Sequence, residues 1–336
     1  GLTSVKAFIH SQTTDMVIAE MGTTYLRIIT VFSLGTLGYM CLEKIVMGTG
    51  KTTITMICQL AGAMTNIILD PIMIYGLLGC PAMGVAGAAW ATVIGQFVSL
   101  IVIATVYFKK GVGIESNIRY LKPERQTLGS IYSIGLPAIV MQILTPIMSY
   151  TLNLILGAIS VSAVTAYGVY YKLQNFIFMP GYGLNNASIP IISYNFGARN
   201  KQRVSQTVRY GLIYVSVIML IGIALLQLFA RQIVGIFSVT EESHQLCVLA
   251  LRIITCGFFF AGANIILQGV CQALGKGIYS LVISLLRFIV LVLPMAWALS
   301  LTENAASLVW LSLPVAEAGA CVAAILLTRK IYRKAL

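Results

Sequence analysis

The chain has 336 residues, of which 58% are hydrophobic and only 10% are charged, and its formal net charge is +12. Soluble domains carry about 25% charged residues, so this composition excludes an ordinary soluble protein. The basic residues gather in alternate loops between apolar stretches. That distribution indicates membrane topology and excludes a surface built to bind nucleic acid.

Apolar stretches of about 20 residues are long enough to cross the hydrocarbon core of a bilayer. Nine of them are present, at approximately residues 24–47, 53–76, 85–108, 128–157, 161–194, 204–228, 243–273, 277–301 and 304–328. The chain is therefore predicted to be an all-α polytopic membrane protein. Because the basic loops and the basic C-terminal residues fall on one side, we expect a multi-pass protein of the cell (inner, cytoplasmic) membrane with a cytoplasmic C-terminus.

An internal repeat organises these stretches. The pentapeptide LRIIT at 26–30 recurs at 251–255, and Gly50-Lys51 recurs at the same offset as Gly275-Lys276. Three apolar stretches precede the second copy, and their counterparts would lie before residue 1. We therefore expect an N-terminally truncated chain with nine of twelve helices, in two parallel repeats of six. The expected parts are a polar remnant (1–23), the second half of an N-lobe (24–110), a cytoplasmic linker (111–127), a C-lobe (128–330) and a cytoplasmic tail (331–336).

Motifs for other chemistries fail on spacing. Gly48-Thr-Gly-Lys-Thr-Thr53 resembles a phosphate-binding loop, but position 45 is Ile where the motif needs Gly, and the segment joins two apolar stretches. The seven cysteines have no CxxC spacing, and there are two histidines. The sequence thus predicts neither an enzyme nor a cofactor.

Charged residues inside apolar stretches mark functional sites by default. Asp70 stands out because Asn66 shares its helix face and Pro71 frees a neighbouring backbone carbonyl. Together these oxygens could bind a proton or Na⁺, although a structural hydrogen-bonded Asp is the alternative. Glu43 is predicted nearer the cytoplasmic side, where it either joins this site or pairs with Lys44.

Two further sets of intramembrane polar residues lie in the second half. Arg287 and Glu317 are equally far along the chain from position 302, in the middle of a short loop, so they are predicted to reach one depth and to form a buried ion pair. This pair is either a structural clamp or part of a proton path. Lys172 has no evident partner, and it belongs to a polar patch that either lines a substrate cavity or packs inside the protein: Tyr171, Lys172, Gln174 and Asn175.

Four segments resemble the multidrug and toxic compound extrusion (MATE) family of cation-coupled antiporters, in particular its bacterial, Firmicutes-type members. They are Asn66–Pro71 with Gly84–Thr92 (GVAGAAWAT), Tyr167–Pro180 (YGVYYKLQNFIFMP), and Pro190–Arg199 (PIISYNFGAR). The resemblance covers about residues 20–330. It implies two six-helix lobes around a central cavity that alternates between inward- and outward-facing states.

The resemblance also implies a function and a site. Small organic cations or drugs would leave as H⁺ or Na⁺ enters, coupled at residues matching Glu43, Asn66, Asp70 and Thr92 with an acidic residue of the first helix. Some relatives use second-lobe acids on the stretches that hold Thr145 and Asn264, and we expect no carboxylate near either residue here. The expected protein is a monomer in contact with membrane lipids; the alternative function is a lipid-linked oligosaccharide flippase of the same superfamily.

Overall fold

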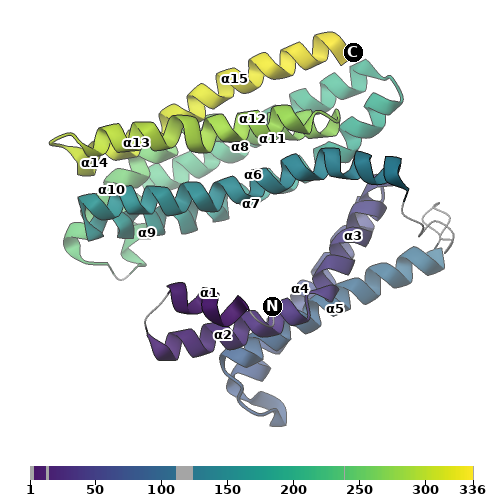
Figure 1. Ribbon diagram of the computed structural model, residues 1–336, viewed down its shortest axis with the longest axis horizontal. Helices are drawn as coiled ribbons and strands as arrows, with labels where there is room; N and C mark the ends of the chain where they lie inside the picture. Colours follow the sequence, from purple (N-terminus) through teal and green to yellow (C-terminus); the bar gives the residue numbers. More distant parts are fainter. Residues whose placement is uncertain (1–3, 13–14, 111–123, 238, 336) are drawn as a thin grey trace. The chain divides into compact units, whose positions relative to one another are not determined.

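The computed structural model of the chain describes residues 4–12, 15–110, 124–237 and 239–335, and those residues contain helices and no strands. Two compact units divide it, Gly1–Tyr120 and Leu121–Leu336 (Figure 1). The predicted linker at 111–127 lies mostly outside the described residues.

Unit 1 is a small helical unit. Its helices are α1 (Ser4–Gln12), α2 (Met16–Val31), α3 (Leu34–Gly48), α4 (Thr52–Tyr75), the short η1 (Leu77–Gly79) and α5 (Val85–Lys110). Helix α2 begins well before the predicted span, because the Asp15 side chain caps it by accepting hydrogen bonds from the backbone amides of Val17 and Ile18.

Unit 2 holds the longer helices. They are α6 (Arg125–Ile159), α7 (Val161–Gly197), α8 (Lys201–Leu228), α9 (Ala230–Gly235), α10 (Glu241–Thr255), α11 (Phe258–Ala273), α12 (Gly277–Leu285), the π-helical η3 (Leu286–Leu291), α13 (Val292–Ser300), α14 (Ala305–Leu308), η4 (Val309–Leu311) and α15 (Ser312–Ala335). The segment formed by α12, η3 and α13 packs against α6 on one side and α15 on the other (Figure 1).

Six helices of the described chain are long and apolar enough to span a membrane, and two bent pairs raise that number to eight. The bent pairs are α2 with α3, at 48°, and α10 with α11, at 50°. The ninth predicted span is the 37-residue helix α7. It is long enough but fails on hydropathy, because polar residues run along it.

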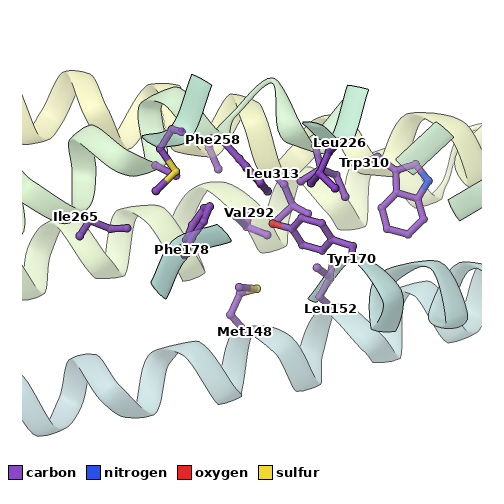
Figure 2. Close-up of a cluster of buried hydrophobic side chains, with 14 of the residues drawn as sticks. Met148, Leu152, Tyr170, Phe178, Leu226, Phe258, Ile265, Val292, Trp310 and Leu313 are labelled. Atoms are coloured by element: carbon purple, nitrogen blue, oxygen red, sulfur yellow. The ribbon is translucent and has the colours of Figure 1, made fainter. Parts of the chain in front are cut away.

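The two units differ in how much they bury. Unit 2 has a large apolar core to which most of its helices contribute, including Met148 from α6, Phe178 from α7, Phe258 from α11 and Leu313 from α15 (Figure 2). The corresponding cluster of unit 1 consists of Val46, Cys58 and Ile103.

Close helix contact partly replaces a core in unit 1. A Cβ added to Gly62 of α4 would lie 2.5 Å from the carbonyl oxygen of Gly95, and one added to Gly87 would lie closer still to that of Met73. Lipid is as apolar as a leucine side chain, so helices in a membrane associate through close packing of small residues. These glycines therefore fix α4 against α5.

Candidate functional site

The predicted coupling residues Asp70 and Asn66 both lie on α4 and are half-buried. The amide Nδ2 of Asn66 donates to Oδ1 of Asp70 at 3.3 Å. Pro71 lies within the same helix. Its ring nitrogen has no hydrogen to donate to the carbonyl of Ile67, which leaves that oxygen free of its helical partner. One turn of α4 thus offers a carboxylate, an amide and a backbone carbonyl.

The glycine contacts place Thr92 opposite this turn. Gly95 approaches Asn66, and Gly87 approaches Met73, so α4 and α5 run antiparallel and Asp70 faces the turn of α5 that carries Thr92. The Thr92 hydroxyl donates to the carbonyl of Ala88 at 2.9 Å. Its oxygen retains the capacity to accept a hydrogen bond or to coordinate a cation.

Gln96 is a second polar residue on α5 that was not predicted from the sequence. It lies one turn beyond Thr92, and its side-chain oxygen accepts a hydrogen bond from the Thr36 hydroxyl of α3. The one-turn spacing between Thr92 and Gln96 could have revealed this polar stripe, because residues i and i+4 share a helix face.

Glu43 is not brought to Asp70. Its carboxylate accepts a hydrogen bond from Tyr39 at 3.3 Å and lies 3.8 Å from Lys44 Nζ. Tyr39 packs on the cluster that contains Cys58, and Cys58 precedes Asp70 by more than three turns of α4. At about 5.4 Å per turn, this separation along the helix is roughly 18 Å. Among the described residues no hydrogen bond links Glu43 to Asp70. Of the two predicted roles of Glu43, the structure shows the pairing with Lys44.

Arg287 and Glu317 of unit 2 are in contact. Nε of Arg287 donates to Oε1 of Glu317 at 2.6 Å, and Arg287 is only 3% exposed. Asn264 of α11 donates through Nδ2 to Oε2 of the same carboxylate at 2.9 Å. The expectation of no carboxylate near Asn264 is therefore wrong. It failed because Glu317 comes from α15, a helix that lies far from Asn264 in the sequence and packs directly on α11.

The polar patch on α7 is divided among different surroundings. Gln174 lines a narrow cavity of about 20 Å³ that Glu317 also lines. Lys172 is exposed, and its Nζ lies 5.8 Å from the ring centroid of Phe237. Tyr171 and Asn175 are exposed as well, and Nδ2 of Asn175 donates to the Tyr171 carbonyl at 2.9 Å. Tyr171, Lys172 and Asn175 are thus exposed, and Gln174 is half-buried.

These features define the class of protein. The described residues form an all-α, multi-pass membrane protein whose polar side chains gather at two intramembrane clusters, one in each unit.

The family follows from comparison with known proteins. A model of the MatE family matches residues 4–72 and 137–298, and the chain belongs to that family. "Multidrug export protein MepA" of Staphylococcus aureus (strain MSSA476) is 27% identical over 307 residues, which are 91% of this chain and 66% of the relative. MepA of Staphylococcus haemolyticus (strain JCSC1435) is 27% identical over 279 residues, covering 83% of this chain and 60% of the relative. The chain thus spans somewhat less than two thirds of these relatives' length.

Solved structures show the same fold. The chain matches "Outward-facing conformation of a multidrug resistance MATE family transporter of the MOP superfamily" with a TM-score of 0.92 at 22% identity, covering 99% of this chain and 75% of the other. It matches "Crystal structure of MATE in complex with MaL6" with a TM-score of 0.91 at 23% identity, with the same coverage.

Proposed function

We propose that the protein exports small organic cations or drugs across the cell membrane, in exchange for H⁺ or Na⁺, by alternating access. Membership in the MatE family and the similarity to proteins named as multidrug exporters support this proposal. In the proposed orientation the basic loops and the C-terminus face the cytoplasm, in keeping with the positive-inside rule.

Asp70 is the coupling residue of this proposal, with Asn66 and Thr92 as its neighbours. The observation that supports the assignment is the hydrogen bond between Asn66 and Asp70 on α4, at the level of the turn of α5 that carries Thr92. At this level the three side chains would offer oxygen atoms to one cation. Na⁺ and H⁺ both bind to such oxygens. A carboxylate inside a membrane costs free energy, and such residues therefore mark functional sites by default.

Coupling would work through charge. An ionised Asp70 attracts an organic cation, and uptake of H⁺ or Na⁺ at the carboxylate cancels that attraction. A ligand shifts a conformational equilibrium by its difference in affinity for the two states. The ion and the drug would therefore bind in alternation rather than together, which exchange requires.

The test is efflux of ethidium, a fluorescent organic cation, from proteoliposomes that hold the full-length protein. A pH gradient and a Na⁺ gradient are imposed separately, and the gradient that drives efflux identifies the ion. We expect Asp70→Asn to abolish driven efflux and Glu303→Gln, which changes an exposed carboxylate, to leave it unchanged. Efflux by Asp70→Asn at the wild-type rate would contradict the assignment.

A further inference from the structure

A polar cavity of about 250 Å³ lies in unit 2, and none of the proposed coupling residues lines it. Helices α6, α7, α11 and α12 with η3 contribute to its wall. Its polar lining includes Gln142, Thr145, Asn185, Gln268, Ser284 and Arg287. Among the described residues that line it, Arg287 is the one charged side chain, and there is no carboxylate.

The Arg287–Glu317 pair is unequal in its hydrogen bonding. Both carboxylate oxygens of Glu317 are occupied, one by Arg287 and the other by Asn264. A guanidinium has five N–H donors, and the contact with Glu317 uses the one on Nε. The donors left over belong to the terminal nitrogens of a side chain that is almost fully buried.

The cationic end of this pair borders the polar cavity. Arg287 lines it, whereas Glu317 lines the separate narrow cavity beside Gln174. The ring of Phe288 lies 4.7 Å from Cζ of Arg287 and covers one face of the guanidinium. The pair is thus a buried dipole, and its positive end lines the polar cavity.

Two amide groups in the same wall also lack partners. Ser284 donates to Oε1 of Gln268 at 3.1 Å, which orients that amide and leaves its Nε2 donor buried without a partner. Oδ1 of Asn185 is buried and unpartnered as well. A buried donor without an acceptor costs free energy. Among the described residues, Gln268 Nε2 is thus a buried donor without an acceptor. The hydrogen bond that Arg287 makes there is the one from Nε to Glu317.

The local backbone is unusual at the same place. Arg287 lies in the π-helical segment η3, and π-helical turns are frequent at functional sites. Pro294 follows within one turn of its end, and its ring would clash with the carbonyl of residue 290 in a regular α-helix. The wider turn accommodates this proline and carries Arg287 in an irregular part of the helix.

We propose that this cavity binds the carboxylate group of a small organic anion, with Arg287 and Gln268 as its donors. Paired N–H donors of arginine match the two oxygens of a carboxylate. Ligand cavities for drug-sized molecules measure roughly 300–1,000 Å³, so this one suits a single ring or one end of a larger molecule. A cation would meet Arg287, and no carboxylate lines the cavity among the described residues.

This inference goes beyond the proposed export of cations, because equilibrium binding requires neither Asp70 nor an ion gradient. The ring of such a ligand would contact the apolar part of the wall, where Met141, Ile265 and Phe288 lie. Benzoate combines a carboxylate with one ring and is therefore the probe. Benzamide and benzylamine have the same ring with a neutral and a cationic group.

The experiment measures binding of the three probes to the purified full-length protein in detergent, by isothermal titration calorimetry. We expect saturable binding of benzoate, binding of benzamide weaker by about tenfold or more, and no binding of benzylamine, because charge-assisted hydrogen bonds are the stronger ones. Absence of saturable benzoate binding, or equal binding of benzoate and benzamide, overturns the proposal.

Variants locate the site. The double variant Arg287→Gln/Glu317→Gln removes both charges without leaving either one unpaired, and we expect it to lose benzoate binding. Gln268→Leu, which keeps the ion pair, is expected to weaken benzoate several-fold and covers the case in which the double variant does not fold. The matched control Arg252→Gln changes an exposed arginine of α10 and should bind as the wild type does. Unchanged benzoate affinity in Gln268→Leu, or in a folded double variant, overturns the assignment.

Discussion

The two copies of the internal repeat use one helical frame for different chemistry. Helices α2, α3 and α4 begin at residues 16, 34 and 52, and α10, α11 and α12 begin at 241, 258 and 277. The bend between the first two helices is 48° in one copy and 50° in the other. Gly50 and Gly275 both have positive φ, which lets the chain turn into the next helix.

The difference appears where the helices of each copy touch. Gly62, at the contact of α4 with Gly95 of α5, corresponds at the repeat offset to Arg287, and Thr92 corresponds to Glu317. In the first copy, α4 and α5 approach closely because Gly62 has no side chain. In the second copy, an ion pair between Arg287 and Glu317 joins the corresponding helices. Asp70 corresponds to Met295, so its carboxylate is peculiar to the first copy. The repeat preserves geometry and leaves polarity free to change.

Breaking the ion pair should have the largest effect on stability. Arg287→Met leaves the largely buried Glu317 carboxylate without its counter-charge, which costs about 3–5 kcal/mol. The double variant Arg287→Met/Glu317→Met removes both charges and should unfold near the wild-type temperature. Thermal unfolding in detergent, followed as a double-mutant cycle, measures both. The single variant Glu317→Met completes the cycle. A double variant as unstable as Arg287→Met would show that the charges are not coupled.

Filling the glycine contact should have the next largest effect. Gly62→Leu places atoms where the Gly95 carbonyl and the Ser99 hydroxyl lie, and a backbone carbonyl cannot rotate away. Overpacking of this kind costs about 1–3 kcal/mol. Gly48→Leu is the control, since nothing lies within 4 Å of a Cβ added there. Equal melting temperatures for the two variants would argue against close contact of α4 with α5.

Replacing Pro294 tests the origin of the π-helical segment. Pro294→Ala restores a backbone donor and removes the ring, so we expect the regular α-helical hydrogen bonds to form across residues 286–291. The change in stability should be small, because a recovered hydrogen bond contributes about 1 kcal/mol. A crystal structure of the variant decides the matter. A persistent π-helix would mean that the contacts of Arg287 maintain it.

Lys172 should matter least for stability. Its contact with Phe237 is exposed, and exposed cation–π contacts contribute about 0.5–1 kcal/mol. Lys172→Met should therefore lower the melting temperature only slightly. Phe237→Leu should lower it more, because the ring also packs on the core of unit 2, and adding Lys172→Met to it should cause no further loss. Additive losses in the double variant would show that the two side chains act independently.

The fold could be predicted well from the sequence, because composition indicates membrane spans and residue spacing indicates repeats. The apolar lengths, the LRIIT repeat and the equal distances of Arg287 and Glu317 from one loop each convert directly into positions along a helix. The α7 span shows where hydropathy fails, since its length predicted a span while its polar residues lower the average.

Side-chain partners were harder to predict because they depend on register between helices. Glu43 is next to Lys44 in the sequence, so their pairing could be predicted. The distance of Glu43 from Asp70 could not, because it depends on how α3 packs against α4. The carboxylate beside Asn264 came from α15, and no spacing in the sequence pairs that helix with α11. What the cavity at Arg287 can bind depends on which hydrogen-bond donors remain without a partner in the folded protein. Residue spacing in the sequence does not predict those donors.

The internal pairing of Arg287 with Glu317 has an electrical consequence. Membrane voltage does work of about 2.3 kcal/mol per 100 mV on each elementary charge that crosses the field. A joined guanidinium and carboxylate move as a neutral body, so displacement of that pair costs the same at any voltage. The lone carboxylate of Asp70, when ionised, has no counter-charge among the described residues that moves with it. Of these two sites, Asp70 is therefore the one whose displacement is expected to depend on voltage.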